Sequence, residues 1–290
     1  MQNLLAPGHR ACAGCSMPTT IKLVLDAAGE NTIVVSPTGC LEVTTTPFPE
    51  SAWCVPWIHS LFENASAVAS GVEVMLKRRC QDTNVVVIGG DGSTFDIGMG
   101  SNSGMFERGH KVLYVCYDNE AYMNTGVQRS GSTPFCVHTT TTPTGVRSLG
   151  NPRPKKDMPA IALAHKVPYV ATASVAYPVD LRRKVKKALQ VNGPSYIQVN
   201  APCITGWTFE AGTTVEISRL AVETGLWPLL EWVNGELADV KKIRRPKKVE
   251  EYLKIQGRYK HLFKKPDGSD AIKDIQSMAD ANIAKYNLVD

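Results

Sequence analysis

Long apolar segments and the pattern of a secretion signal are both missing from the sequence. No apolar run approaches the roughly 18 consecutive residues that are typical of a membrane-spanning helix. The first residues also lack the charged-then-apolar pattern of a secretion signal. We therefore expect a cytoplasmic protein with no membrane partner.

Strong net charge and internal repeats are missing as well. The net charge is +5 over 290 residues, and basic residues concentrate in two segments, 241–248 and 254–265. Neither segment matches a nucleic-acid-binding motif, so both fit a solvated or subunit-facing surface better than a nucleic-acid interface. No Ser-His-Asp arrangement has a spacing that indicates nucleophilic catalysis.

What the sequence does contain is an alternation of strand-like and helix-like segments. A hydrophobic content of 43% in a chain of this length is enough for a large core. The alternation predicts a doubly wound α/β fold with a mostly parallel sheet. We expect strands at 32–36, 84–89, 112–117, 169–173 and 195–199, and helices at 19–28, 60–79, 96–108, 158–165 and 179–191.

Two stretches and the C-terminal part depart from this alternation. Residues 44–57 contain three prolines and are expected to form an irregular loop. Residues 125–158 form so long an irregular stretch that a functional role or cover by a partner is expected. The sequence predicts a cofactor-binding domain over 1–210, and an extension over 211–290 that ends in a charged, helical arm and contacts other subunits.

Two strand ends carry the most informative residues. One expected strand leads into Gly90, Asp91 and Gly92, and the next leads to Asn119 and Ala121. Because these strands are joined by one helical crossover, both turns fall at the carboxyl edge of the sheet. A carboxylate and an amide oxygen there suit Mg²⁺, and the glycines allow a diphosphate to approach the backbone closely. Taken alone, a Gly-Asp-Gly turn can equally be an ordinary turn with a capping aspartate.

The segment that follows the second strand makes the pattern more specific. Together with the Gly-Asp-Gly turn, residues 118–126 resemble the diphosphate-binding motif of thiamine diphosphate enzymes. The resemblance implies that Asp91, the Asn119 side chain and the Ala121 carbonyl hold Mg²⁺. It also implies that Asn124 lies near the diphosphate and the reacting thiazolium, where it would act in catalysis.

Four of the eight cysteines form a second group. Cys12 and Cys15 form a CxxC, Cys40 ends the first expected strand, and Cys203 follows the last. Four thiolates at one sheet edge could hold a [4Fe–4S] cluster or a tetrahedral zinc ion, and a structural or coincidental grouping stays open. A neighbouring thiamine site favours the cluster, since a cluster accepts single electrons and zinc does not.

The other cysteines and one glutamate receive weaker assignments. Cys116 is expected in the core, and Cys80 has no expected function. Cys54 and Cys136 lie in irregular segments that could face the cofactor, but no role is assigned to them. Glu63, near a helix start, is expected to line the cofactor site or to cap the helix rather than to transfer protons.

A set of segments spread over residues 7–210 carries a family resemblance. The chain resembles the β subunit of 2-oxoacid:ferredoxin oxidoreductases, most closely the pyruvate branch, at residues 7–15, 38–45, 57–59, 62–64, 90–92, 117–126 and 201–203. The resemblance implies a [4Fe–4S] cluster on Cys12, Cys15, Cys40 and Cys203, beside thiamine diphosphate and Mg²⁺. It also implies that an α subunit carries the pyrimidine-binding half of the site, so that this chain is catalytically incomplete alone.

The reaction implied is the oxidative decarboxylation of a small 2-oxoacid, with pyruvate first. Single electrons would pass through the cluster to other iron–sulfur subunits and to ferredoxin, and coenzyme A is a possible co-substrate. Atypical residues at 16–17, 93–105 and 135–153 leave a related 2-oxoacid or oxalate open. Two further alternatives are a non-catalytic electron-transfer or structural metal-site subunit and a non-redox thiamine decarboxylase.

Overall fold

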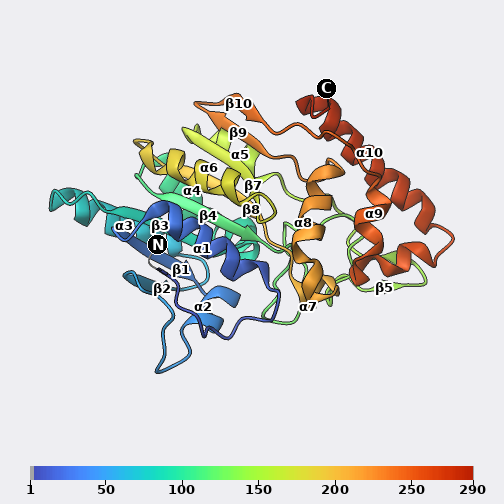
Figure 1. Ribbon diagram of the computed structural model, residues 1–290, viewed down its shortest axis with the longest axis horizontal. Helices are drawn as coiled ribbons and strands as arrows, with labels where there is room; N and C mark the ends of the chain where they lie inside the picture. Colours follow the sequence, from blue (N-terminus) through green and yellow to red (C-terminus); the bar gives the residue numbers. More distant parts are fainter. Residues whose placement is uncertain (1–2, 290) are drawn as a thin grey trace.

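The computed structural model describes residues 3–289, whose main sheet has the strand order β10-β9-β7-β8-β4-β3-β1-β2 (Figure 1). The six strands from β7 to β2 in this order run parallel, whereas β9 and β10 are antiparallel to their neighbours. The strands are β1 (Thr32–Pro37), β2 (Trp57–Ser60), β3 (Asn84–Gly90), β4 (Leu113–Asp118), β7 (Tyr169–Ser174), β8 (Ser195–Asn200), β9 (Leu230–Val233) and β10 (Glu236–Val240). The predicted mostly parallel α/β fold is confirmed.

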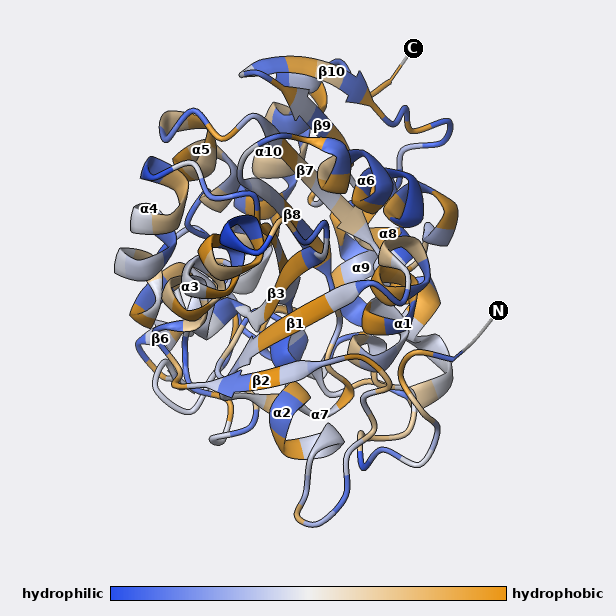
Figure 2. Cartoon of the chain, turned by 90° about the vertical axis from the view of Figure 1, so that its left-hand side faces the viewer, coloured by the Kyte–Doolittle hydropathy of each residue, from blue (hydrophilic) through white to orange (hydrophobic). Residues whose placement is uncertain are grey.

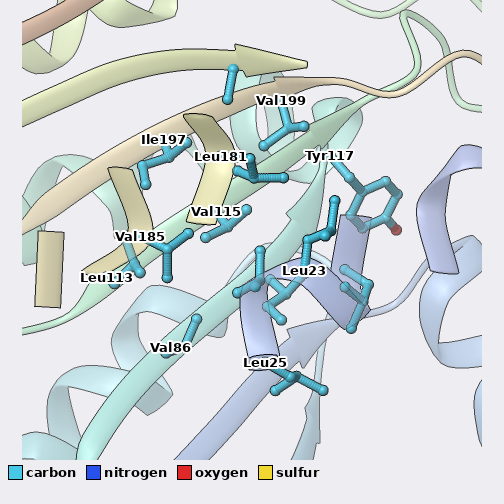
Figure 3. Packing of buried hydrophobic residues seen from close by; sticks show 14 of the residues in the cluster. Leu23, Leu25, Val86, Leu113, Val115, Tyr117, Leu181, Val185, Ile197 and Val199 are labelled. Atoms are coloured by element: carbon cyan, nitrogen blue, oxygen red, sulfur yellow. The ribbon is translucent and has the colours of Figure 1, made fainter. Parts of the chain in front are cut away.

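Helices cover both faces of the sheet. The strand period of two sends Val86 and Ile88 of β3 to one face and Val85 and Val87 to the other. The first face packs against α1 (Ser16–Ala28) and α6 (Pro178–Gln190), as Figure 3 shows for part of the cluster. The second face packs against α3 (Ala65–Arg78), α4 (Met99–Glu107) and α5 (Met158–Ala164). In Figure 2 the predominantly hydrophobic strands β1 and β3 lie between these layers.

A third cluster of buried side chains lies beside the sheet and belongs mainly to the C-terminal part. It combines Trp207 with apolar residues of the C-terminal helices. These elements gather on the right-hand side of Figure 1: α7 (Ile204–Trp207), the 3₁₀ turn η2 (Ala211–Thr213), α8 (Thr214–Glu223), α9 (Val249–Lys254), the 3₁₀ helix η3 (Gly257–Phe263) and α10 (Gly268–Tyr286). The expected domain boundary at residue 210 stays a prediction; β9 and β10, which follow it, extend the main sheet.

Several expected element boundaries were wrong. The segment expected to be an irregular loop after residue 44 is preceded by the short helix α2 (Cys40–Thr45) and ends in edge strand β2, so the next helix begins at Ala65 rather than near residue 60. The helix expected over 96–108 is split into a π-helical turn, η1 (Gly92–Ile97), and α4. The split falls at Gly98, where a Cβ atom would lie 2.1 Å from the Ser93 carbonyl oxygen.

The long stretch over residues 125–158 is largely irregular, as predicted, and contains one small hairpin, β5 (Thr144–Gly145) and β6 (Ser148–Leu149). No helix within the described part of the chain is long and apolar enough to cross a membrane.

Candidate functional site

A pocket opens at the carboxyl ends of β1, β3 and β4, where the sequence places its most informative residues. It is lined by Thr38, Gly39, Cys40, Phe62, Gly90, Asp91, Gly92, Ser93, Tyr117, Asn119, Ala121, Tyr122, Met123, Asn124 and Thr125. The two turns predicted to meet therefore do meet, because β3 and β4 are parallel neighbours in the sheet. One of the four grouped cysteines, Cys40, lies in the same pocket.

Close packing explains why a glycine follows Asp91. A Cβ atom on Gly92 would lie 2.3 Å from a ring carbon of Tyr122, which is far inside van der Waals contact. The Tyr122 hydroxyl in turn lies 3.2 Å from Asp96 Oδ2 and 3.3 Å from the Gly92 carbonyl oxygen. The Tyr122 ring therefore fixes the first turn after β3 against the segment after β4.

Asp91 is almost fully buried, with 1% of its surface exposed. Its Oδ2 accepts a hydrogen bond of 2.5 Å from the Ser130 hydroxyl. Burial raises the pKa of the Asp91 carboxyl well above its ordinary value; the nearby Asp118 raises it further, while Ser130 and Lys155 act in the opposite direction. A buried carboxylate of this kind is stabilised by a cation placed against it.

The Asn119 side chain brings its amide to the free oxygen of Asp91. One terminal atom of this amide lies 2.8 Å from Asp91 Oδ1 and 2.9 Å from the backbone carbonyl oxygen of Ala121. With nitrogen at this position the amide donates to both oxygens. With oxygen there, three oxygens face one another, an arrangement that a cation bound among them would stabilise.

A second buried carboxylate lies directly behind the site. Asp118 accepts hydrogen bonds from Ser132 (2.6 Å) and Gln198 (2.7 Å), and its Oδ2 lies 2.8 Å from the ammonium of Lys155. Burial raises the pKa of Asp118, and the Lys155 charge offsets part of this rise. The irregular stretch over 125–158 thus supplies Ser130, Ser132 and Lys155 to the surroundings of the site.

Asn124 and Glu63 lie at the margin of this arrangement. The Asn124 side chain is exposed and contributes to the pocket wall. Glu63 is exposed and is not among the pocket-lining residues; its backbone carbonyl accepts a hydrogen bond of 2.6 Å from Ser101. The expected contact between Glu63 and a cofactor stays a prediction.

Of the four grouped cysteines, Cys12, Cys15 and Cys203 lie near enough to Cys40 to raise its pKa, and three of the four lie at helix N-termini. Cys15 is the N-cap of α1, Cys40 is the first residue of α2, and Cys203 is the N-cap of α7, where its Sγ accepts a hydrogen bond from the Gly206 N–H at 3.4 Å. The Cys15 N–H bonds back to the Cys12 carbonyl at 3.0 Å, which closes the CxxC turn. The partial positive charge of a helix N-terminus favours a thiolate at these positions.

Burial and the neighbouring thiols both raise the pKa values of Cys40 and Cys15. Burial raises the pKa of Cys40 to about 12, and the thiols of Cys203, Cys15 and Cys12 raise it in the same direction. Burial also raises the pKa of Cys15 to about 11, with smaller contributions in the same direction from Cys203 and Cys12. Among residues 3–289, no three His, Cys, Asp or Glu side chains are close enough to form a metal-binding group.

The remaining cysteines lie apart from the pocket lining. Cys116 is buried inside β4, as its strand position predicts, and Cys80 is exposed. Cys54 is exposed in the loop before β2, and Cys136 is buried in the third core cluster with a left-handed backbone (φ 61°). Neither Cys54 nor Cys136 lines the pocket.

Sequence reasoning missed the residues that support the 119–121 turn from behind. The Trp207 indole N–H donates to the Asn119 carbonyl oxygen at 2.7 Å, and Arg258 pairs with Glu120 at 2.7 Å. Trp207 lies just after Cys203, and Lys155 belongs to the long irregular stretch for which the sequence predicts a functional role or cover by a partner. No motif in the sequence points to Arg258.

Residues 37–199 match a protein family described as the C-terminal TPP-binding domain of thiamine pyrophosphate enzymes. The pyruvate synthase subunit PorB of Methanosarcina barkeri is 60% identical over 98% of this chain and 97% of its own length. The chain belongs to the PorB family of thiamine pyrophosphate enzymes. PorB of Methanothermobacter thermautotrophicus is 56% identical, covering 90% of this chain and 91% of its own.

Another relative is named for a different substrate, ketoisovalerate. The ketoisovalerate oxidoreductase subunit VorB of Pyrococcus abyssi is 48% identical over 89% of this chain and 85% of its own. Because the relatives are subunits of pyruvate synthase and of a ketoisovalerate oxidoreductase, the oxalate alternative is not favoured. The fold is shared with 2-oxoglutarate:ferredoxin oxidoreductase from Magnetococcus marinus, with a TM-score of 0.58 and 23% identity over 74% of this chain and 79% of that chain.

Proposed function

We propose that this chain is the β subunit of a thiamine diphosphate-dependent 2-oxoacid:ferredoxin oxidoreductase, with pyruvate as the first candidate substrate. One observation carries the proposal: a buried carboxylate, a side-chain amide and a backbone carbonyl converge in the same pocket as Cys40. The first three groups suit the cation that accompanies a diphosphate, and the cysteine suits a redox centre beside it.

The spacing of the three polar groups fits Mg²⁺. In an octahedral site with metal–oxygen distances of 2.0–2.1 Å, neighbouring ligand oxygens lie about 2.9 Å apart. The Asn119 amide lies 2.8 Å from Asp91 Oδ1 and 2.9 Å from the Ala121 carbonyl oxygen, which agrees with this spacing. The chain would present these oxygens to Mg²⁺ with the amide oxygen of Asn119 turned inward. The remaining positions would be left to diphosphate oxygens and water.

The cysteine group fits an iron–sulfur cluster in its chemistry. Three of the four cysteines lie at helix N-termini, and burial together with the other three thiols raises the pKa of Cys40. Thiols held this way keep their protons until a cation replaces them. Cys12, Cys15, Cys40 and Cys203 would hold the cluster.

The proposed cation site and the cysteine group would serve different parts of the reaction. When bound, thiamine diphosphate supplies the carbanion chemistry of 2-oxoacid decarboxylation, and an adjacent cluster accepts electrons one at a time. The residues of this chain would anchor and orient the cofactor: Asp91, Asn119 and Ala121 would hold the cation, and Gly90 and Gly92 would allow the backbone to approach the diphosphate. Asn124, which is exposed on the pocket wall, would meet the reacting part of the cofactor.

A partner would complete the site. Apolar side chains are exposed on segments next to the pocket: Val43 on α2, Phe48 in the following loop and Leu61 beside Phe62. We assign this surface to the α subunit that carries the pyrimidine-binding half, while subunits with further clusters, ferredoxin and possible coenzyme A complete the reaction. A cytoplasmic location is expected.

Cofactor retention in the assembled complex tests the thiamine assignment. Asp91→Ala should abolish retention of thiamine diphosphate after gel filtration, because it removes the charged ligand. The control Asp157→Ala changes an aspartate that caps α5 outside the pocket, and it should retain the cofactor. Equal retention in both variants would refute the assignment.

Spectroscopy of anaerobically purified protein tests the cluster. Visible absorption that is bleached by dithionite is expected, and it should be lost in Cys203→Ser but kept in Cys80→Ser, which alters an exposed cysteine. A colourless protein with stoichiometric zinc would exclude the cluster. Viologen or ferredoxin reduction by the complex with pyruvate, other 2-oxoacids and oxalate, with and without coenzyme A, then identifies the substrate.

A further inference from the structure

Glu120, which stands between the two proposed cation ligands Asn119 and Ala121, has an unusual backbone conformation. Its φ is +69°, in the left-handed region that residues with a side chain adopt infrequently. A long side chain stays in this region only where its surroundings over-determine it. The turn that presents both ligands therefore depends on what holds Glu120.

Every polar atom of Glu120 has a partner. Its N–H donates to Asp118 Oδ1 at 3.1 Å, and its carbonyl accepts from the Thr133 hydroxyl at 2.7 Å. Of the carboxylate oxygens, Oε1 lies 2.9 Å from the Lys155 ammonium, and Oε2 accepts from Arg258 Nη2 at 2.7 Å. Glu120 and Arg258 are each only 3% exposed, so this ion pair is shielded from water.

Arg258 also contacts Trp207, the residue that holds the Asn119 carbonyl. Its guanidinium lies 3.6 Å from the centre of the Trp207 ring, in stacking contact. The Trp207 indole N–H donates to the Asn119 carbonyl oxygen at 2.7 Å. Arg258 therefore acts on the turn twice, directly through the Glu120 carboxylate and indirectly through the indole that holds Asn119.

We propose that Arg258 is a positioning residue for the cation site: through Glu120 and Trp207 it fixes the turn that directs the Asn119 side chain and the Ala121 carbonyl at Asp91. The inference rests on the proposed function, since it concerns the same Mg²⁺ and diphosphate site. Arg258 belongs to η3, outside residues 37–199 that match the thiamine pyrophosphate enzyme pattern. The C-terminal segment is thereby part of the support of the cofactor site rather than only a surface for other subunits.

The chain contains a matched control for the buried ion pair. Glu231 on β9 is 1% exposed and, like Glu120, is paired with one arginine and one lysine, Arg183 at 3.1 Å and Lys187 at 2.5 Å. It does not line the pocket. Glu231→Gln therefore perturbs the same kind of interaction without touching the proposed site.

The test measures the Mg²⁺ affinity of the assembled complex after removal of metal by chelation. Thermal stabilisation by Mg²⁺ is titrated at saturating thiamine diphosphate. Glu120→Gln, Arg258→Met and Trp207→Phe should weaken the apparent Mg²⁺ affinity by about 10–100-fold, the range typical of residues that orient metal ligands. Arg258→Lys keeps the charge but loses the planar stack, so it should recover part of the affinity. Glu231→Gln should keep the wild-type affinity even if its melting temperature falls.

The outcomes separate this inference from the proposed function. If the wild-type complex shows no Mg²⁺-dependent thiamine diphosphate binding, the proposed function fails. If the wild type binds but Glu120→Gln and Arg258→Met match its Mg²⁺ affinity, the positioning role is overturned and the proposed function stands. If Arg258→Met does not assemble, Glu120→Gln and Trp207→Phe decide. The first weakens the ion pair with Arg258, and the second removes the donor to Asn119 while keeping an aromatic ring against Arg258. Wild-type Mg²⁺ affinity in both variants would overturn the positioning role.

Discussion

The Ser130 hydroxyl donates a hydrogen bond of 2.5 Å to Oδ2 of the buried Asp91, while Asp91 Oδ1 faces the Asn119 amide at 2.8 Å. The two oxygens of one carboxylate thus have separate roles, one held by the irregular stretch after β4 and the other turned to the proposed cation. Ser130 favours the charged form of Asp91 against the burial that raises its pKa.

Ser130→Ala should therefore make cation binding more sensitive to acid. The cation binds the carboxylate form of Asp91, so affinity falls as the pH is lowered through the raised pKa of this group. Loss of the Ser130 donor raises that pKa further, so the fall in affinity should begin at a higher pH. We expect about tenfold weaker Mg²⁺ binding at neutral pH.

Mg²⁺ titrations of the complex at a series of pH values measure this loss of affinity. Ser195→Ala, which removes a buried hydroxyl bonded to the Ala188 carbonyl, is the control. Superimposable profiles for Ser130→Ala and wild type would contradict the role.

Gly92→Ala should destabilise the chain. The new Cβ atom would lie 2.3 Å from the Tyr122 ring, so the ring and the turn after β3 must separate. Overpacking of this kind costs about 1–3 kcal/mol of unfolding free energy. Gly71→Ala in α3 meets open space and should instead stabilise the chain by about 0.5–1 kcal/mol. Denaturant unfolding of the isolated chain compares the two, and equal effects would exclude the proposed close packing.

The sequence predicts the pocket well because its signals are local. A strand that ends in Gly90-Asp91-Gly92 and a parallel strand that ends near Asn119 must bring these residues to one edge, whatever the exact helix boundaries are. The same logic brings Cys40 and Cys203 to that edge, since they follow β1 and β8.

The supports of the pocket could not be predicted, because they depend on contacts between distant segments. Ser130 and Asp91 are 39 residues apart, and Arg258 and Glu120 are 138 apart. No periodicity or turn preference specifies such a pair. The short edge strand β2 was missed for a related reason: its four residues are fixed by pairing with β1 rather than by a pattern of their own.

Phe48→Ser should weaken assembly with partner subunits. Phe48 is 97% exposed in the loop between α2 and β2, close in sequence to Cys40 of the pocket. Truncating a residue that anchors an interface costs on the order of 1–2 kcal/mol, so about tenfold weaker association is expected. Val146→Ser changes an equally exposed apolar residue in the β5–β6 hairpin and should leave association unchanged. Analytical ultracentrifugation of the mixed subunits distinguishes the variants. Unchanged assembly with Phe48→Ser would remove this loop from the interface.

His261 should make the folded chain less stable in mild acid. Burial lowers the pKa of its imidazole below the ordinary value of about 6.5. The hydrogen bond to the Leu149 carbonyl offsets part of this shift, and the nearby charge of Lys265 adds to it. The folded state therefore binds fewer protons than the unfolded state between the two pKa values, so the free energy of unfolding falls as the pH drops below about 6.5.

His261→Gln keeps a donor for the Leu149 carbonyl, which lies 2.9 Å from His261 Nε2, but the glutamine cannot titrate. Urea unfolding from about pH 5 to pH 8 should show a shallower pH dependence for this variant than for the wild type. Identical slopes would assign the acid sensitivity to other groups.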